Sequence, residues 1–227
     1  MGWKTSTIII TPRPDLPFEN LLNSLGLTDL KRIDDEPFET ALNPGGNKVY
    51  IGSYKDSLII SVPEIPASFL TENISDAEKI LISECPGAEI CAITLHSVVN
   101  FWGYSIIKNG QKIRARAGAS DDGTFLEHGA PLPEEEALLS KSTIDDHGNR
   151  IYLLDEFPGE PFAEDQVGEN FVFEISSRYF GTPLDSADEL LFETILTGYH
   201  FSNNSKSNRD SSSKGIQLKN KPWWKFW

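Results

Sequence analysis

The sequence predicts an α+β protein with a largely antiparallel or mixed sheet, helices packed on that sheet, and a disordered C-terminal tail. Three observations support this fold class. Residues 88–118 contain three consecutive strand-like segments around an Asn-Gly turn, residues 164–180 contain a helical apolar stripe, and the composition changes abruptly at Ser202. The predicted organisation is a single α+β domain over residues 1–201, a disordered polar and basic linker over 202–222, and an aromatic motif over 223–227.

The clearest local signal is a hairpin that turns at Asn109-Gly110. This residue pair supplies the two positive-φ positions of a two-residue type I′ turn. The turn sets the register of the two strands, because each position along one strand then has a fixed partner on the other. The predicted pairs are Lys108 with Gln111, Ile106 with Ile113, Tyr104 with Ala115 and Trp102 with Ala117. In this register one face is apolar, and the other holds Lys112, Arg114 and Arg116 beside Gly103 and Ser105.

The N-terminal part predicts a strand, a helix and a second hairpin. Thr5–Thr11 is a β-branched run that ends at Pro12, which is typical of a buried strand. Asp15 is the expected cap of a helix over Leu16–Leu25, which ends at Gly26. After the break at Pro44-Gly45-Gly46, Lys48–Ser53 and Ser57–Val62 flank Tyr54-Lys55-Asp56 as the second hairpin.

Start and stop signals predict further helices. Ser75 and Asp76 begin a helix that Pro86-Gly87 ends, and a short helical piece over Glu134–Leu139 follows a segment that is mostly loop after Gly118. Val167, Phe171, Ile175 and Tyr179 recur at a spacing of four, so Glu164–Phe180 is expected to pack one side of a helix on the sheet. Ser186-Ala187-Asp188-Glu189 matches a capping box and predicts a last helix over Ala187–Thr197.

Composition and charge limit the function. The 227 residues have 39% hydrophobic content and a formal charge of −14, so the chain can bury a sizeable core. The segment from Ser202 onward holds six basic residues and one acidic residue, a net charge of +5, which leaves −19 on the preceding body. Such an acidic body argues against nucleic acid as its partner, because phosphate binding requires Lys and Arg. No long apolar leader or membrane span is present in the sequence, so a cytoplasmic location is expected.

Candidate chemistry centres on four side chains, His96, Lys112, Arg114 and Arg116. Two guanidinium groups on one strand face would offer bidentate contacts to a carboxylate or phosphate, with His96 nearby. The alternative is a solvated basic face paired with acidic residues of the following segment. These are Asp121, Asp122, Glu127, Glu134, Glu135 and Glu136.

No pattern in the sequence predicts a catalytic, cofactor or metal site. His96, His128, His147 and His200 lack ligand spacing, and Cys85 and Cys91 are too few for a zinc pattern or a disulfide framework. We expect two buried thiols. The acidic segments Asp121-Asp122-Gly123 and Asp145-Asp146-His147-Gly148 are interpreted as turns.

The tail ends in an aromatic cluster, Trp223, Trp224, Lys225, Phe226 and Trp227. Three targets are open: the protein's own acidic body, the pocket of a partner protein, where Trp is a frequent anchor, or an anionic membrane surface, where Trp prefers the interface. The sequence does not choose among them.

Several of these features together resemble an uncharacterised family of small bacterial proteins, a domain of unknown function. The shared features are Met1-Gly2-x-Lys4-Thr5 before a strand, the Leu95–Val99 segment LHSVV, a Trp-containing strand, the Asn109-Gly110 turn with a basic strand after it, and Glu127-His128-Gly129-x-Pro131-Leu132 before an acidic helix. The resemblance covers roughly residues 1–201 and implies no assigned activity.

The function expected from the sequence is a non-catalytic protein-binding module, in the class of immunity or regulatory factors, with the tail as a second contact to a partner or membrane. The alternative is a small-anion-binding domain or hydrolase that uses the Lys112, Arg114 and Arg116 face. A cleft with convergent polar groups over that face would favour the alternative.

Overall fold

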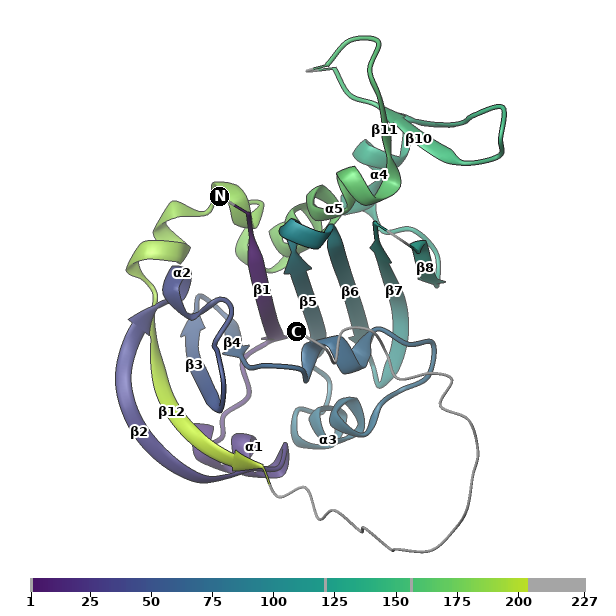
Figure 1. Cartoon of the computed structure of the whole chain (residues 1–227). Helices are drawn as coiled ribbons and strands as arrows, with labels where there is room; N and C mark the ends of the chain where they lie inside the picture. Colours follow the sequence, from purple (N-terminus) through teal and green to yellow (C-terminus); the bar gives the residue numbers. More distant parts are fainter. Residues whose placement is uncertain (1, 121, 156, 204–227) are drawn as a thin grey trace, which may run out of the picture.

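A nine-stranded antiparallel sheet organises the chain, with strand order β2-β12-β3-β4-β1-β5-β6-β7-β8 (Figure 1). It is seen in a computed structural model that describes residues 2–120, 122–155 and 157–203. Helices pack on the sheet, so the predicted α+β class is confirmed, and the sheet is antiparallel throughout. The strands of this sheet are β1 (Lys4–Thr11), β2 (Leu27–Pro37), β3 (Lys48–Tyr54), β4 (Ser57–Ser61), β5 (Glu89–His96), β6 (Phe101–Lys108), β7 (Gln111–Ala119), β8 (Gly123–His128) and β12 (Ile195–Asn203).

Helices cover both faces of the sheet, and a second, three-stranded sheet projects from one end of it (Figure 1). The helices are α1 (Phe18–Ser24), α2 (Phe38–Ala41), α3 (Asp76–Glu84), α4 (Pro133–Leu139) and α5 (Glu164–Phe180). Short helical turns are η1 (Pro66–Phe69), η2 (Ser97–Val99), η3 (Leu184–Ser186) and η4 (Glu189–Glu193). The small sheet has the order β11 (Pro161–Ala163), β10 (Arg150–Leu153) and β9 (Ser142–Ile144).

The two faces of the large sheet bury separate apolar cores. On the first, here called the α5 face, Ile9, Ile93 and Trp102 pack against α5 and its neighbours, with Phe171 fully buried. On the second, the α3 face, Ile8, Ile90 and Ile107 pack against α1, α3 and η1. Consecutive residues of one strand thus enter different cores, as the period of two requires.

Several elements form where local signals predicted them. Asn109 and Gly110 both have positive φ, at 52° and 73°, so the hairpin turn is confirmed. Ser75 caps α3 in a reciprocal pair with Glu78, because each side chain accepts a hydrogen bond from the other residue's backbone N–H. Helix α5 spans Glu164–Phe180 as predicted and ends at Gly181, whose φ is 84°. These elements are specified by short stretches of sequence.

The last predicted helix, over Ala187–Thr197, forms only in its first half. The chain makes the short π-helix η4 (Glu189–Glu193) and then enters β12, which lies between β2 and β3 in the large sheet. The capping-box residues at 186–189 do not form a side-chain cap. Pairing of β12 with two other strands satisfies its backbone on both sides, and that tertiary gain overrides the local helix signal.

Other differences are smaller. Helix α1 begins at Phe18 with Pro17 before it, so Asp15 is not its cap. The long edge strand β2 and the edge strand β8 were not predicted, because both are mostly exposed and lack a clear apolar alternation. The small sheet was also missed. The predicted linker and aromatic motif lie outside the described residues, apart from the end of β12.

Candidate functional site

A β-bulge in β7 decides where the basic side chains lie. Lys108 pairs with Gln111 and Ile107 with Lys112, but Ile106 then pairs with Arg114 instead of Ile113. The extra residue shifts the register by one position. Beyond the bulge, every side chain of β7 therefore lies on the opposite face from the predicted one.

The prediction of one basic strand face is consequently wrong. Arg116 pairs with Tyr104, and both Arg114 and Arg116 lie on the α5 face. Lys112 lies on the α3 face, where its ammonium group meets Glu78 of α3. His96 also belongs to the α3 face, since its neighbour Leu95 packs in the core of the α5 face. The bulge thus separates the four candidate residues into two groups.

Arg114 forms an ion pair with the buried carboxylate of Glu135. Its guanidinium group donates to Glu135 of α4 through Nε at 2.9 Å and Nη2 at 2.6 Å. Tyr104 donates to the same carboxylate at 2.6 Å, and Nη1 of Arg114 donates to the carbonyl of Gly129 at 2.8 Å. The Arg114 and Glu135 side chains are both 0% exposed. Burial raises the pKa of Tyr104 and the neighbouring Glu135 carboxylate raises it further, which keeps the phenol protonated as a donor.

Arg116 lies against aromatic rings and pairs with the first residue of α5. Its Nη2 donates to Glu164, which also accepts from Tyr152 at 2.8 Å. The guanidinium carbon lies 4.3 Å from the ring centroid of Phe171 and 5.4 Å from that of Trp102. This contact is a cation–π arrangement in a buried setting, where such contacts are strongest. Nε and Nη1 of Arg116 have no hydrogen-bond partner among the described residues.

On the α3 face, the ammonium group of Lys112 has a full set of partners within the chain. Its Nζ atom is 2.9 Å from Glu78 and donates to the carbonyls of Phe69 and Thr71 at 2.7 Å each. The side chain is 2% exposed. All three basic residues are therefore engaged by groups of the same chain and removed from solvent. This arrangement favours a structural role, and anion binding by these residues stays a prediction.

His96 lies at the edge of an open hollow on the α3 face, called here the β1–β5 pocket. The pocket has a volume of about 460 Å³ and is lined by Ser6, Thr94 and His96 from the strand ends, together with residues of the 43–47 and 63–67 segments. Burial lowers the pKa of His96, and nearby Lys4 lowers it further, so the ring is neutral near pH 7. Its Nδ1 atom and the Oγ1 atom of Thr94 are buried and have no hydrogen-bond partner among the described residues.

The two cysteines are buried free thiols, as predicted. Burial raises the pKa of Cys85 to about 11, with a smaller contribution from Glu84. Burial also raises the pKa of Cys91 far above its ordinary value. Among the described residues, no group of three or more His, Cys, Asp or Glu side chains is placed to hold a metal ion.

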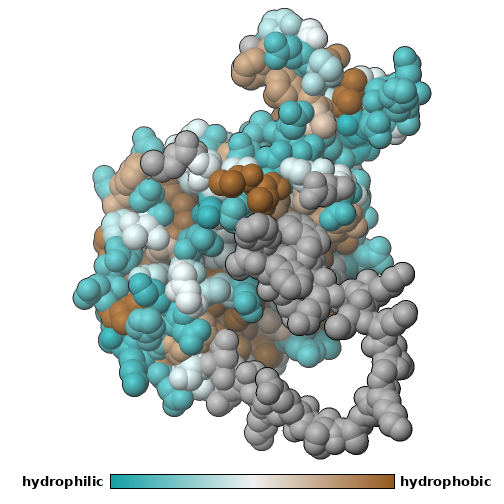
Figure 2. All heavy atoms as spheres, in the orientation of Figure 1, coloured by the Kyte–Doolittle hydropathy of each residue, from teal (hydrophilic) through white to brown (hydrophobic). Residues whose placement is uncertain are grey.

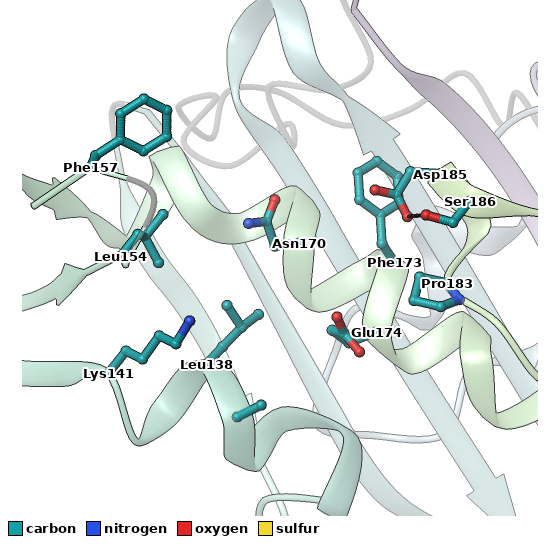
Figure 3. A pocket seen from close by; sticks show the side chains of 11 residues that line it. Leu138, Lys141, Leu154, Phe157, Asn170, Phe173, Glu174, Pro183, Asp185 and Ser186 are labelled. Carbon is teal, nitrogen blue, oxygen red and sulfur yellow. Dashed lines mark hydrogen bonds between the residues drawn. The ribbon is translucent and has the colours of Figure 1, made fainter.

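A second hollow, the α4–α5 pocket, has a volume of about 440 Å³ and lies between α4, α5 and the turn η3 (Figure 3). One part of its lining is apolar, with Leu138, Leu154 and Phe173. The other part is polar, with Lys141, Asn170, Glu174 and Asp185, and the ammonium group of Lys141 pairs with Asp155 at 2.9 Å. Burial raises the pKa of Glu174, and neighbouring Asp185 raises it further. The pocket suits an elongated group with an apolar stem and a cationic or hydrogen-bonding end.

The small sheet and its loops, residues 142–163, form an arm that extends away from the body beside this pocket (Figure 1). Three large apolar side chains on it are exposed, with Ile144 at 60%, Leu153 at 47% and Phe157 at 51%. Phe157 also lines the α4–α5 pocket (Figure 3). Hydrophobic colour is visible on the arm among its hydrophilic surroundings (Figure 2). Phe157 connects the arm with the pocket, whereas Ile144 and Leu153 lie on opposite faces of the small sheet. The arm and the pocket are the candidate surface.

The sequence reasoning missed this surface. Its residues follow no ligand spacing or helical period, and exposed apolar residues are common singly on protein surfaces. The available signals were the acidic turn at residues 145–148 and the alternation along 150–153, which indicate a hairpin. Only the fold shows that the hairpin is left uncovered.

Fold and site together define an α+β protein with internally paired charges and an uncovered, partly apolar arm. The chain belongs to a family of unknown function, DUF6928, whose family model matches residues 19–175. The predicted resemblance to a domain of unknown function is thereby confirmed, although the opening Met1-Gly2-x-Lys4-Thr5 lies outside the matched residues. No curated protein and no solved structure matches the chain.

Two further sequence predictions concern the membrane and the tail. Within the described ranges, no helix is both long and apolar enough to cross a bilayer. The candidate docking residues Trp223, Trp224, Lys225, Phe226 and Trp227 lie outside the described residues.

Proposed function

We propose that the protein is a non-catalytic binding module that contacts a partner protein through the arm and the adjoining α4–α5 pocket. The observation that supports it best is the exposure of Ile144, Leu153 and Phe157 on one projecting element. Exposed apolar side chains on a projecting element are available for contact with a partner, and an aromatic residue at a pocket edge is typical of an interface centre.

The chemistry of the surface suggests what the partner presents. The arm sequence contains five acidic residues and one basic residue, so its net charge is −4. The pocket adds Glu174 and Asp185 beside the apolar groups of Leu138 and Phe173, and its own lysine, Lys141, already pairs with Asp155 of the arm. A Lys or Arg side chain of the partner would place its stem on these apolar groups and its charge near the carboxylates. The proposed partner is therefore a protein that inserts an apolar, Lys or Arg side chain into the pocket and surrounds it with basic residues that face the acidic arm.

A non-catalytic role is consistent with the buried cations. Arg114 and Lys112 already have carboxylate partners at 2.6 and 2.9 Å, and both are removed from solvent. The alternative anion-binding or hydrolase role would require these groups to face a cleft, and in the described part of the chain Arg114 and Lys112 face carboxylates instead. The acidic body and arm suit a regulator that occupies a basic site on its partner.

The proposal is tested by capture of the native partner on the immobilised full-length protein. The double variant Leu153→Ser/Phe157→Ser removes apolar contact area from the arm without touching the buried network. The matched control is Phe192→Ser, because Phe192 is 59% exposed but lies outside the arm and pocket. We expect a captured protein that the arm variant loses by at least tenfold and the control retains. Equal capture by all three proteins would contradict the assignment of the arm.

A further inference from the structure

The β1–β5 pocket is a site that the proposed function does not use. It lies on the α3 face at the ends of β1 and β5, on a different part of the sheet from the arm. Part of its lining is apolar, with Ala67, Val99 and Phe101, and the edge of the hollow is formed by the Pro44-Gly45-Gly46 segment. A hollow of about 460 Å³ with apolar walls accommodates aromatic side chains.

The unpaired polar groups of this pocket can accept a hydrogen bond from an occupant. Thr94 is 8% exposed, and its Oγ1 has no hydrogen-bond partner among the described residues. The buried Nδ1 of His96 also has no hydrogen-bond partner among the described residues, and a neutral imidazole offers one nitrogen as an acceptor. An indole N–H is a donor only, so a Trp side chain can donate to either the Thr94 hydroxyl oxygen or the His96 nitrogen. Unpaired buried polar atoms are costly, which favours an occupant that pairs with them.

The charge of the body suits a basic occupant. The pocket lining contains the carboxylate of Glu64 and no Lys or Arg, and Lys4 lies near His96 at the pocket edge. The segment from Ser202 onward has a net charge of +5, and the preceding body has −19. Attraction between a basic tail and an acidic body raises the population of docked states, most strongly at low ionic strength.

The described chain ends beside this pocket. The backbone N–H of Phe201 donates to the carbonyl of Asn47 at 3.0 Å, and Asn47 lines the pocket. Asn203 follows two residues later, a separation of at most about 7 Å. The tail therefore starts close to the edge of the pocket, whereas the arm extends from the other end of the molecule (Figure 1).

The length of the tail allows a return to the pocket. Residues 204–221 separate Asn203 from Pro222-Trp223-Trp224. Eighteen residues with the statistics of a polar linker span about 21–25 Å, which suits folding back onto a site near the start of the linker. A linker of this length gives an effective concentration on the order of millimolar, so even weak contacts by the aromatic residues would keep the pocket occupied.

From these observations we infer that the C-terminal aromatic segment, Trp223 to Trp227, docks in the β1–β5 pocket of its own chain. Among the three targets left open by the sequence, the pocket favours the protein's own body. Because this inference does not involve the arm, it stands or falls separately from the proposed function.

The first test compares amide hydrogen exchange in two full-length proteins, the wild type and Trp223→Ser/Trp224→Ser/Trp227→Ser. The substitutions keep every charge of the tail and remove its aromatic rings. We expect exchange to become at least fivefold faster in segments 43–47, 63–67 and 94–101, with no change in the arm. Unchanged exchange in these segments would overturn the inference, even if the same substitutions abolished binding to anionic vesicles or to a partner.

The second test identifies the chain that supplies the tail. In the full-length protein, Val99→Cys/Phe226→Cys under mild oxidation should form a disulfide within one chain, seen at the monomer mass. The matched control is Phe192→Cys/Phe226→Cys, in which we expect crosslinking to be at least tenfold slower, because Phe192 lies outside the pocket. Cys85 and Cys91 do not interfere, because both are buried. Crosslinked dimers as the main product would assign the pocket to the tail of a second copy and overturn the inference, as would equal rates in both variants.

Discussion

The buried charge network beneath α5 and the arm beside it differ in the exposure of their side chains to solvent. In the network Arg114, Glu135 and Arg116 are all 0% exposed, and each has a partner within the chain. In the arm, Leu153 and Phe157 are about half exposed, and Phe157 lies at the edge of a hollow. The contrast occurs within one strand. Tyr152 of β10 is fully buried and donates a hydrogen bond to Glu164, whereas the next residue, Leu153, faces solvent.

This difference indicates that the network mainly stabilises the fold, whereas the arm is available for binding. Buried polar groups that satisfy one another fix the positions of helices and strands but present nothing to an external molecule. Exposed apolar groups contribute little to folding and remain available for association. We therefore expect substitutions in the network to change the free energy of unfolding and substitutions in the arm to change binding.

The largest effect is expected at Glu135. Glu135→Gln leaves the buried guanidinium of Arg114 without its counter-charge and should lower the free energy of unfolding by about 3–5 kcal/mol. Urea denaturation followed by circular dichroism measures this change. The control is Glu127→Gln at a 40% exposed partner of the same arginine, with an expected cost below about 1 kcal/mol. Similar costs for the two variants would mean that the network is not the stabilising unit described here.

The second effect concerns the contact of α5 with the sheet. A Cβ atom on Gly168 would overlap the indole ring of Trp102, so Gly168→Ala must displace the helix or the ring. Overpacking of this kind costs about 1–3 kcal/mol. Gly45→Ala is the control, because a Cβ there meets nothing within 4 Å and the residue has no positive φ. A stable Gly168→Ala protein would show that α5 is not held tightly on Trp102.

The third effect is a dependence of stability on pH. Burial alone would raise the pKa of Glu89, but hydrogen bonds from Arg178 and Tyr179 outweigh burial and hold this pKa below its ordinary value of 4.5. A lowered pKa in the folded state stabilises the fold above pH 4.5, and the contribution is lost as the pH falls through the folded-state value. Glu89→Gln should therefore be less stable than the wild type near pH 7 and should lose less stability on acidification. Parallel stability curves from pH 7 to pH 3 would contradict this assignment.

A much smaller effect is expected in the arm. Leu153→Ser and Phe157→Ser should each change the free energy of unfolding by no more than about 0.5 kcal/mol, because both side chains are about half exposed. The measurement is the same urea titration used for Glu135→Gln. A cost above 1 kcal/mol would place these residues in the folded core and weaken the distinction between network and arm.

No effect is expected from added anions. Arg114 and Arg116 are paired with carboxylates and excluded from solvent, so phosphate, sulfate or a dicarboxylate should produce no saturable rise in Tm. The Arg114→Gln/Arg116→Gln protein serves as the comparison if the wild type is stabilised. A saturable rise in Tm that this variant loses would support the anion-binding alternative over the structural role.

Local signals in the sequence were sufficient for elements that depend on a few neighbouring residues. Asn109-Gly110 specified the turn, the Ser75 and Glu78 pair specified the start of α3, and the stripe from Val167 to Tyr179 specified α5. In each case the relevant hydrogen bonds or apolar contacts repeat within one turn or one helical period. The burial of both thiols and the α+β class followed from similarly short-range patterns.

The tertiary structure alone decided two features that the sequence reasoning did not predict. One extra residue at Ile113 moved Arg114 and Arg116 from the expected solvent face into the core, since a shift of one position exchanges the two faces of a strand. Ile195–Asn203 became a strand because β2 and β3, distant in sequence, were available to pair with it. The bulge and the strand depend on contacts between residues far apart in the chain, whose pairing no local pattern encodes.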